Sequence, residues 1–439
     1  MTFPVGNAII VRRGNIWNMA DGKEKRMANI RPFSCIRPCR EKAGRIAALP
    51  YDVYNAQEAR QLTSGNPDSF LNIDRPETQF PEGTDMYEDK VYKRAHDLLW
   101  EKVSDGSFVR DERRCYYIYE LTMEGRTQTG IVACASIDDY ENRIIKKHEN
   151  TRADKEADRI RHVDACNAQT GPIFLAYRSD WTINHVVERV KQEEPLYDFI
   201  SEDGIRHRVF VMEHDTDIQA VRQAFAGMQA IYIADGHHRA ASAVKVGQKR
   251  RAAHAGYTGE EEFHYFLSVL FPDDQLMIMD YNRVVKDLAG MTPARFLEKV
   301  ATILDVEQIP REARRPRRKG ECSLYLDGNW YRCTFRAQDI GDDPVKSLDV
   351  SLLQDLLLGP VLGILDPKTD KRIDFVGGIR GLDELEQRVR TDCAAAFALY
   401  PTAIDELFAV ADAGLLMPPK STWFEPKLRS GLFIHELDG

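Results

Sequence analysis

The residues best suited to chemistry stand together in one segment, Asp235-Gly236-His237-His238-Arg239. The apolar run 230–234 before it predicts a buried strand, and the alanine-rich run after it predicts a helix. The first N–H groups of a helix have no partner and the helix dipole adds positive charge there, so a helix start binds phosphate readily. Gly236 lets a ligand approach the backbone, while the histidines and Arg239 add donors for its oxygens. The segment therefore predicts an oxyanion site at a strand-to-helix corner.

Asp235 admits two interpretations. As a helix N-cap it would accept hydrogen bonds from the following N–H groups, which stabilises a helix by about 1 kcal/mol. An acid, two histidines and an arginine within five residues exceed what a cap requires. We therefore favour a functional carboxylate.

A second polar cluster, His148-Glu149-Asn150-Thr151, lies between a predicted strand and a predicted helix. On that helix Lys155, Asp158, Arg159 and His162 are spaced three and four residues apart, which places them on neighbouring turns of one face. A solvent-facing charged helix would give the same pattern. The cluster before it favours a ligand site, because α/β proteins place ligands at such corners.

Two further stretches carry candidate ligands. The run 49–55 contains Tyr51 and Asp52 at the end of a predicted strand. The run 417–427 holds three prolines, which oppose regular structure, and Lys420, Ser421 and Thr422, which offer donors for phosphate. A stiff surface loop is the alternative for this second stretch.

The pattern along the chain predicts a mixed α/β protein. Runs 116–121 and 128–137 around Glu124-Gly125 predict a hairpin, and apolar spacing over 85–104 predicts an amphipathic helix. We predict a leader over 1–29, either poorly ordered or a late-added strand, a phosphate-binding catalytic domain over 30–290, and a C-terminal α+β lobe over 291–439.

Composition narrows the classes of protein. The formal net charge of −9 opposes binding to nucleic acid and to anionic lipid. No apolar stretch approaches the roughly 20 residues that span a bilayer, and no signal peptide is evident, so we expect a cytoplasmic protein with no membrane partner. The eight cysteines are scattered, which predicts reduced, structural thiols. No feature of the sequence indicates an oligomeric state.

Five motifs in this order resemble domain-of-unknown-function family 1015, over about residue 30 to the C-terminus. They are 49–53, 148–151, Asp158-Arg159, 235–239 and 417–422. The Asp-Gly-His-His-Arg element also resembles the phosphate-binding motif of the ParB and sulfiredoxin superfamily, which includes kinases of free serine. The resemblance implies a ParB/sulfiredoxin-like core with a second C-terminal α+β lobe and a ligand cleft between them.

The implied activity is transfer of a phosphoryl group from pyrophosphate, or from ADP or ATP, to free L-serine, which gives O-phosphoserine for cysteine synthesis. Such transfer needs positioning, neutralisation of charge on the oxygens, and a base for the hydroxyl proton. An acid beside a bound phosphate repels it unless a cation lies between, so we predict Mg²⁺ as the cofactor with Asp235 as its ligand. The partners are then small molecules alone.

The resemblance implies a role for individual residues of these motifs. Asp235, Glu149 and His238 are the expected catalytic residues, with Asp235 or Glu149 as the base. The expected phosphate-binding residues are Gly236, His237, His238, Arg239, Arg159, Lys155, Lys420, Ser421 and Thr422. Those expected to bind substrate are Asp52, Tyr51, His148 and Thr151, with Asp52 also a possible metal ligand.

Two other functions are compatible with the same site. A ParB-like nucleotide-binding regulator would lack kinase activity, but it should carry a helix-turn-helix and a basic face, and the sequence shows neither. A phosphohydrolase would release phosphate without an acceptor. The P-loop and protein-kinase signatures are absent from the sequence.

Overall fold

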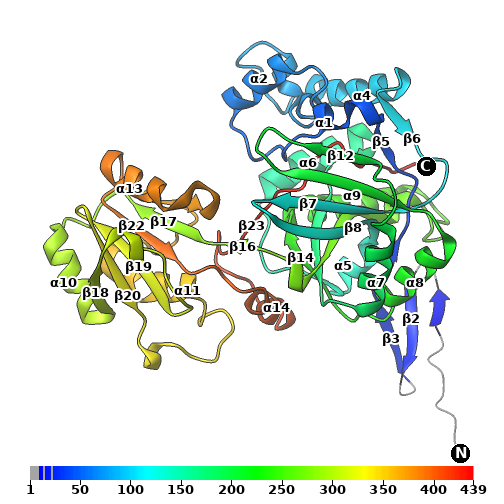
Figure 1. Cartoon of the computed structure of the whole chain (residues 1–439). Coiled ribbons are helices and arrows are strands. Elements are labelled where there is room, and N and C mark those ends of the chain that lie inside the picture. Colours follow the sequence, from blue (N-terminus) through cyan, green and yellow to red (C-terminus); the bar gives the residue numbers. More distant parts are fainter. Residues whose placement is uncertain (1–8, 13–14, 21–22, 439) are drawn as a thin grey trace, which may run out of the picture. The chain divides into compact units, whose positions relative to one another are not determined.

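The computed structural model describes residues 9–12, 15–20 and 23–438, and the chain divides into two compact units (Figure 1). Unit 2 is Met277–Glu425, and unit 1 holds the chain up to Leu276 and again from Pro426. The predicted boundary near 290 and the assignment of the whole C-terminus to the second lobe are therefore wrong. Strand pairing is the reason: β17 (Tyr281–Val285) lies within the sheet of unit 2, while β24 (His435–Glu436) pairs with β10 (Ala168–Gln169) of unit 1.

A nine-stranded mixed sheet forms the centre of unit 1, which confirms the predicted fold class. The hairpin around Glu124-Gly125 forms as predicted, since both residues adopt the positive φ angles (51° and 79°) that a tight turn needs. The strands, in their order across the sheet, are β12 (Tyr197–Ile200), β13 (Arg206–Met212), β7 (Tyr116–Met123), β8 (Arg126–Ser136), β15 (Tyr265–Pro272), β11 (Ile173–Tyr177), β14 (Ile231–Asp235) and β9 (Ile145–Lys146), with β4 (Ile30–Arg31) on β8.

Helices of unit 1 cover the sheet and bury its apolar side chains. One core cluster joins side chains of β7, β8, β11, β14 and β15 to those of several helices, among them Val187, Phe225 and Val244. The helices are α1 (Ala43–Ile46), α2 (Ala56–Gly65), α3 (Leu71–Asp74), α4 (Asp89–Ser104), α5 (Ile137–Glu141), α6 (Ala153–Cys166), α7 (Trp181–Val190), α8 (Asp215–Phe225) and α9 (His237–Ala253). A second cluster packs α2, α3 and α4 against β5 (Ile36–Pro38) and β6 (Phe108–Arg110).

The segment predicted as a leader contains regular structure where it is described. Strands β1 (Ile9–Arg12), β2 (Asn15–Ala20) and β3 (Lys23–Met27) form an antiparallel three-stranded sheet. This sheet is separate from the nine-stranded sheet, and the choice between a poorly ordered leader and a late-added strand stays a prediction. Residues 1–8, which belong to the same prediction, lie outside the described residues.

Unit 2 is built on an antiparallel six-stranded sheet, and its α+β character agrees with the prediction for the C-terminal lobe. The strands, in order, are β18 (Asp305–Ile309), β20 (Asn329–Thr334), β19 (Glu321–Leu326), β22 (Ala395–Leu399), β17 and β21 (Ile373–Gly377). The helices are α10 (Pro293–Ile303), α11 (Asp349–Leu353), α12 (Gly359–Leu362), α13 (Gly381–Thr391) and α14 (Ile404–Asp412), with a π-helical turn at Gln354–Leu358. The chain enters and leaves unit 2 through β16 (Ile278–Met279) and β23 (Trp423–Phe424), which pair with each other.

Two expectations from the composition, reduced cysteines and no membrane-spanning helix, can be compared with the structure. All eight cysteines carry free thiols, as predicted. Within the described ranges, no helix combines the length and the apolar character that crossing a bilayer would require.

Candidate functional site

The corner predicted to bind an oxyanion is formed by the end of β14, a glycine turn and the start of α9. Gly236 adopts φ 89° and ψ 31°, a left-handed conformation that suits glycine, and α9 begins at His237. The guanidinium of Arg239 lies over this glycine, since a Cβ placed there would be 3.1 Å from its Nε and Nη2 atoms. Arg239 also donates through Nη1 to the Pro172 carbonyl at 2.6 Å, which fixes its direction. The corner thus combines a helix N-terminus with the guanidinium of Arg239, which is oriented by a hydrogen bond.

Gly236→Ala should destabilise the protein by about 1–3 kcal/mol, because the left-handed backbone and the crowding against Arg239 both oppose a Cβ. Urea unfolding at pH 7 measures the loss. Gly204→Ala is the matched control, since Gly204 has a similar φ of 79° but no atom within 4 Å of the added carbon. Equal losses in the two variants would show that Arg239 does not crowd Gly236.

Asp235 is the acid of this corner, and two cations face it. Its Oδ2 atom lies 3.4 Å from Nζ of Lys427 and 3.8 Å from Nη2 of Arg239. Burial acts to raise the pKa of Asp235, but the charges of Lys427 and Arg239 outweigh it and hold that pKa well below its usual range. Asp235 is therefore a carboxylate at neutral pH. Lys427 was not among the predicted site residues.

Strand topology brings the second predicted cluster to the same corner. β9 and β14 are parallel neighbours, with Ile145 opposite Ile231 and Lys146 opposite Tyr232. Because parallel strands end at the same edge, the segment after β9 lies beside the segment after β14. The rings of His148 and His237 accordingly meet edge to face with centroids 4.5 Å apart.

Both histidines at the start of α9 are neutral at pH 7. Burial lowers the pKa of His237 well below its usual value, and burial likewise lowers that of His238. The His238 Nε2 atom accepts the Arg152 N–H at 3.0 Å, which leaves Nδ1–H as its donor. The predicted histidine donors are thus neutral imidazoles rather than cations.

His148 makes stability depend on pH, because burial lowers its pKa from 6.5 to about 4. The unfolded chain takes up a proton near pH 6.5 whereas the folded protein resists it, so the contribution of His148 is complete above pH 6.5 and is lost as pH falls toward 4. The total is roughly 3 kcal/mol. We expect His148→Gln to flatten the fall in unfolding free energy between pH 7 and 5 in urea titrations. The exposed His214 provides the control variant His214→Gln, and equal slopes for both variants would contradict the expectation.

The remaining predicted residues of unit 1 differ in their surroundings. Glu149 places Oε2 3.9 Å from His237 Nδ1, and Thr151 donates its hydroxyl to Glu156 at 2.8 Å. Lys155 is half-buried and Asp52 is exposed, and the charges of both act on His238. Thr151 is therefore committed to the first turn of α6, while the others surround the corner.

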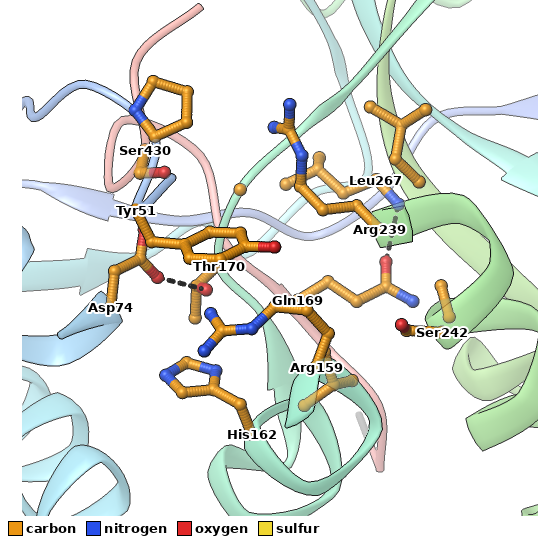
Figure 2. A pocket seen from close by; sticks show the side chains of 15 residues that line it. Tyr51, Asp74, Arg159, His162, Gln169, Thr170, Arg239, Ser242, Leu267 and Ser430 are labelled. Carbon is orange, nitrogen blue, oxygen red and sulfur yellow. Dashed lines mark hydrogen bonds between the residues drawn. The ribbon is translucent and has the colours of Figure 1, made fainter. Parts of the chain in front are cut away.

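A pocket lies within unit 1 next to the corner (Figure 2). Among the predicted residues, Tyr51, Arg159 and Arg239 line it. The side chains that also line it are Pro50, Asp74, His162, Val163, Gln169, Thr170, Ile173, Ser242, Ala243, Leu267 and Ser430. Arg239 borders both this pocket and Gly236 of the corner.

Arg159 is buried and paired. Its Nε and Nη2 atoms contact Asp158 Oδ2 at 3.0 and 2.8 Å, and its guanidinium stacks on the Tyr51 ring at 3.9 Å from the centroid. Tyr92 donates its hydroxyl to Asp158 at 2.8 Å. The α6 face with Asp158, Arg159 and His162 therefore points inward, which excludes a solvent-facing charged helix.

Lys420, Ser421 and Thr422 belong to unit 2, and their role in binding phosphate stays a prediction. Lys420 Nζ lies 5.5 Å from the ring centroid of Tyr281, and Ser421 donates its hydroxyl to the Pro418 carbonyl at 2.7 Å. Thr422 is half-buried. These contacts lie within unit 2.

No three His, Cys, Asp or Glu side chains gather into a metal site anywhere in the described ranges. Mg²⁺, however, commonly takes only one or two carboxylates together with substrate phosphates and water. The ionised carboxylate of Asp235 at an oxyanion corner fits that donor set. The predicted Mg²⁺ is therefore compatible with the residues present.

Comparisons with solved structures give weak similarity. Free serine kinase in complex with AMP is 14% identical with a TM-score of 0.35, covering 69% of this chain and 91% of that chain. A conserved hypothetical protein from Pyrococcus furiosus is 15% identical with a TM-score of 0.35, covering 69% and 94%. SbnI with C-terminal truncation from Staphylococcus aureus is 11% identical with a TM-score of 0.34, covering 67% and 82%.

No curated protein matches this sequence. The family described as protein of unknown function, DUF1015, matches residues 30–351. That span covers most of the chain and contains four of the five motifs that carry the resemblance. The chain therefore belongs to the DUF1015 family.

Proposed function

We propose that this protein is a small-molecule kinase that transfers a phosphoryl group from pyrophosphate, or from ADP or ATP, to the hydroxyl of free L-serine. The observation that carries the proposal is the position of Arg239. Its guanidinium covers Gly236 at the oxyanion corner and also lines the adjoining pocket. One side chain thus borders a place for a phosphate donor and a place for a small acceptor.

The donor binds at the corner. Its oxygens accept hydrogen bonds from the first N–H groups of α9 and from Arg239, and the neutral His238 adds an Nδ1–H donor. Lys427 and Arg239 supply positive charge where the transferring group carries negative charge. Mg²⁺, when bound by Asp235 and phosphate oxygens, would neutralise further charge on the donor.

The acceptor lies in the pocket with its hydroxyl toward Arg239. The oxygen of the acceptor hydroxyl forms a bond to the terminal phosphorus of the donor while the bridging P–O bond breaks. When pyrophosphate is the donor, its other phosphate group leaves as inorganic phosphate. The hydroxyl proton passes to a carboxylate, Asp235 or Glu149. Buried walls such as Tyr51 and Ile173 limit water at the reacting atoms.

The test is incubation with L-serine and Mg²⁺ and, separately, pyrophosphate, ADP or ATP, with O-phosphoserine measured by mass spectrometry and phosphate measured in parallel. We expect one phosphate for each O-phosphoserine with pyrophosphate as donor. Equal phosphate release with and without serine would indicate a hydrolase. Binding of a nucleotide without product from any donor would favour the regulatory alternative, and either result overturns the proposal.

A further inference from the structure

Asp74 is a buried acid of the pocket, and its carboxylate forms no ion pair with any of the described residues. It ends α3, is 3% exposed, and accepts the Thr170 hydroxyl on Oδ1 at 3.0 Å (Figure 2). Within the described ranges, no Lys, Arg or His nitrogen lies within 4.0 Å of its carboxylate. Burying a carboxylate without a cationic partner is costly, so such a group in a pocket calls for a cation from a ligand.

The neighbouring acids differ from Asp74 because each has a cation of its own. Asp158 pairs with Arg159, and Asp235 pairs with Lys427 and Arg239. Asp74 acts to raise the pKa of Arg159, but the Nε and Nη2 atoms of Arg159 contact Asp158. Asp74 also acts electrostatically on His162 without forming an ion pair with it, so the carboxylate of Asp74 is the acceptor that the pocket leaves for its occupant.

We propose that Asp74 and Thr170 form an ammonium subsite, so that the pocket selects acceptors with a protonated primary amine. The Nη1 group of Arg159, outside its pair with Asp158, is the complementary donor for a carboxylate. A carboxylate and a guanidinium in one pocket match the ammonium and carboxylate groups of an amino acid. Because the acceptor must also carry a hydroxyl group, the acceptor class is the hydroxy-α-amino acids. This inference rests on the proposed function and deepens it, because it assigns the acceptor's amine to residues that the sequence did not predict.

The subsite discriminates against acceptors that lack the amine. Glycerate carries the carboxylate and the primary hydroxyl of serine but has a hydroxyl in place of the ammonium group. It would leave the charge of Asp74 uncompensated, and sites built to bind a charged group reject ligands without it. The pocket should therefore prefer L-serine to glycerate by about 100-fold or more.

The experiment compares the full-length protein with Asp74→Asn, a replacement of the same shape without the charge. We expect Asp74→Asn to weaken L-serine binding by about 10- to 100-fold in calorimetry and to remove the preference for serine over glycerate, with pyrophosphate binding within about twofold of wild type. Asp68→Asn is the matched control, since Asp68 lies in the same segment but pairs with Lys42, Arg45 and Lys102 outside the pocket.

The outcomes separate this inference from the proposed function. Serine binding by Asp74→Asn equal to wild type, or equal use of glycerate and serine by wild type, would overturn the ammonium subsite. Serine binding that needs Asp74 without O-phosphoserine from any donor would leave the subsite standing and remove the kinase. Should Asp74→Asn melt early, Thr170→Val together with the glycerate comparison on wild type decides the question, with weaker serine binding expected in Thr170→Val.

Discussion

Asp235→Asn should lower kcat/KM for phosphoryl transfer by about 10²- to 10⁴-fold, the range expected when a group that handles a proton or compensates charge in the transition state is removed. The carboxylate of Asp235 orders two cations at the corner and is one of two candidates for the proton acceptor. The amide cannot carry the charge that faces Lys427 and Arg239. Initial rates of O-phosphoserine formation over a range of pyrophosphate concentrations measure the loss.

Asp215→Asn is the control for this substitution. Asp215 also stands at the start of a helix, α8, but its side chain is 84% exposed and its partner is the exposed Arg113. We expect its activity within about twofold of wild type, because exposed ion pairs contribute little. Full activity in Asp235→Asn, with an unchanged circular dichroism spectrum, would remove Asp235 from the reaction.

Arg239→Lys should lower kcat/KM by about 10²- to 10³-fold although the charge is kept. The guanidinium reaches the Pro172 carbonyl, covers Gly236 and faces Asp235 at the same time. A lysine ammonium cannot make this planar set of contacts. Calorimetry with pyrophosphate separates the loss of donor binding from the loss of rate.

Arg40→Lys controls for the change from a guanidinium to an ammonium. Arg40 likewise donates to backbone carbonyls, those of Pro195 and Leu196, but it is exposed and lies outside the pocket. We expect its kinetics to match wild type. Donor binding in Arg239→Lys as tight as in wild type would show that Arg239 does not hold the donor.

Local structure could be predicted from the sequence wherever neighbouring residues decide it. The strand, the glycine turn and the helix of the corner follow from residues 230–243 alone, because a short apolar run, a residue tolerant of positive φ and an alanine-rich run each specify one conformation. The hairpin at Glu124-Gly125 followed in the same way. The burial of one face of α6 was harder to predict from the sequence. The spacing of its polar residues also fits a solvent-exposed helix, and only tertiary packing determines which face is buried.

The site residues that sequence reasoning missed come from distant parts of the chain. Asp74 stands in a four-residue helix with no motif around it, and Thr170 and Gln169 lie in an ordinary polar run. Lys427 is the last residue of the proline-rich stretch 417–427, in which attention went to Lys420 instead. Their placement depends on pairings such as β10 with β24, in which Gln169 faces His435, and no local pattern encodes such pairings.

Unit 2 is an insertion in the chain of unit 1, since Leu276 and Pro426 flank it. A ribosome must therefore make all of residues 277–425 before the lysine that neutralises Asp235 exists. A nascent chain that has already folded residues 30–276 would still present an incomplete corner to metabolites. In the proposed kinase reaction, turnover would thus begin only after the inserted unit has been synthesised, so partly translated copies would not consume the phosphate donor.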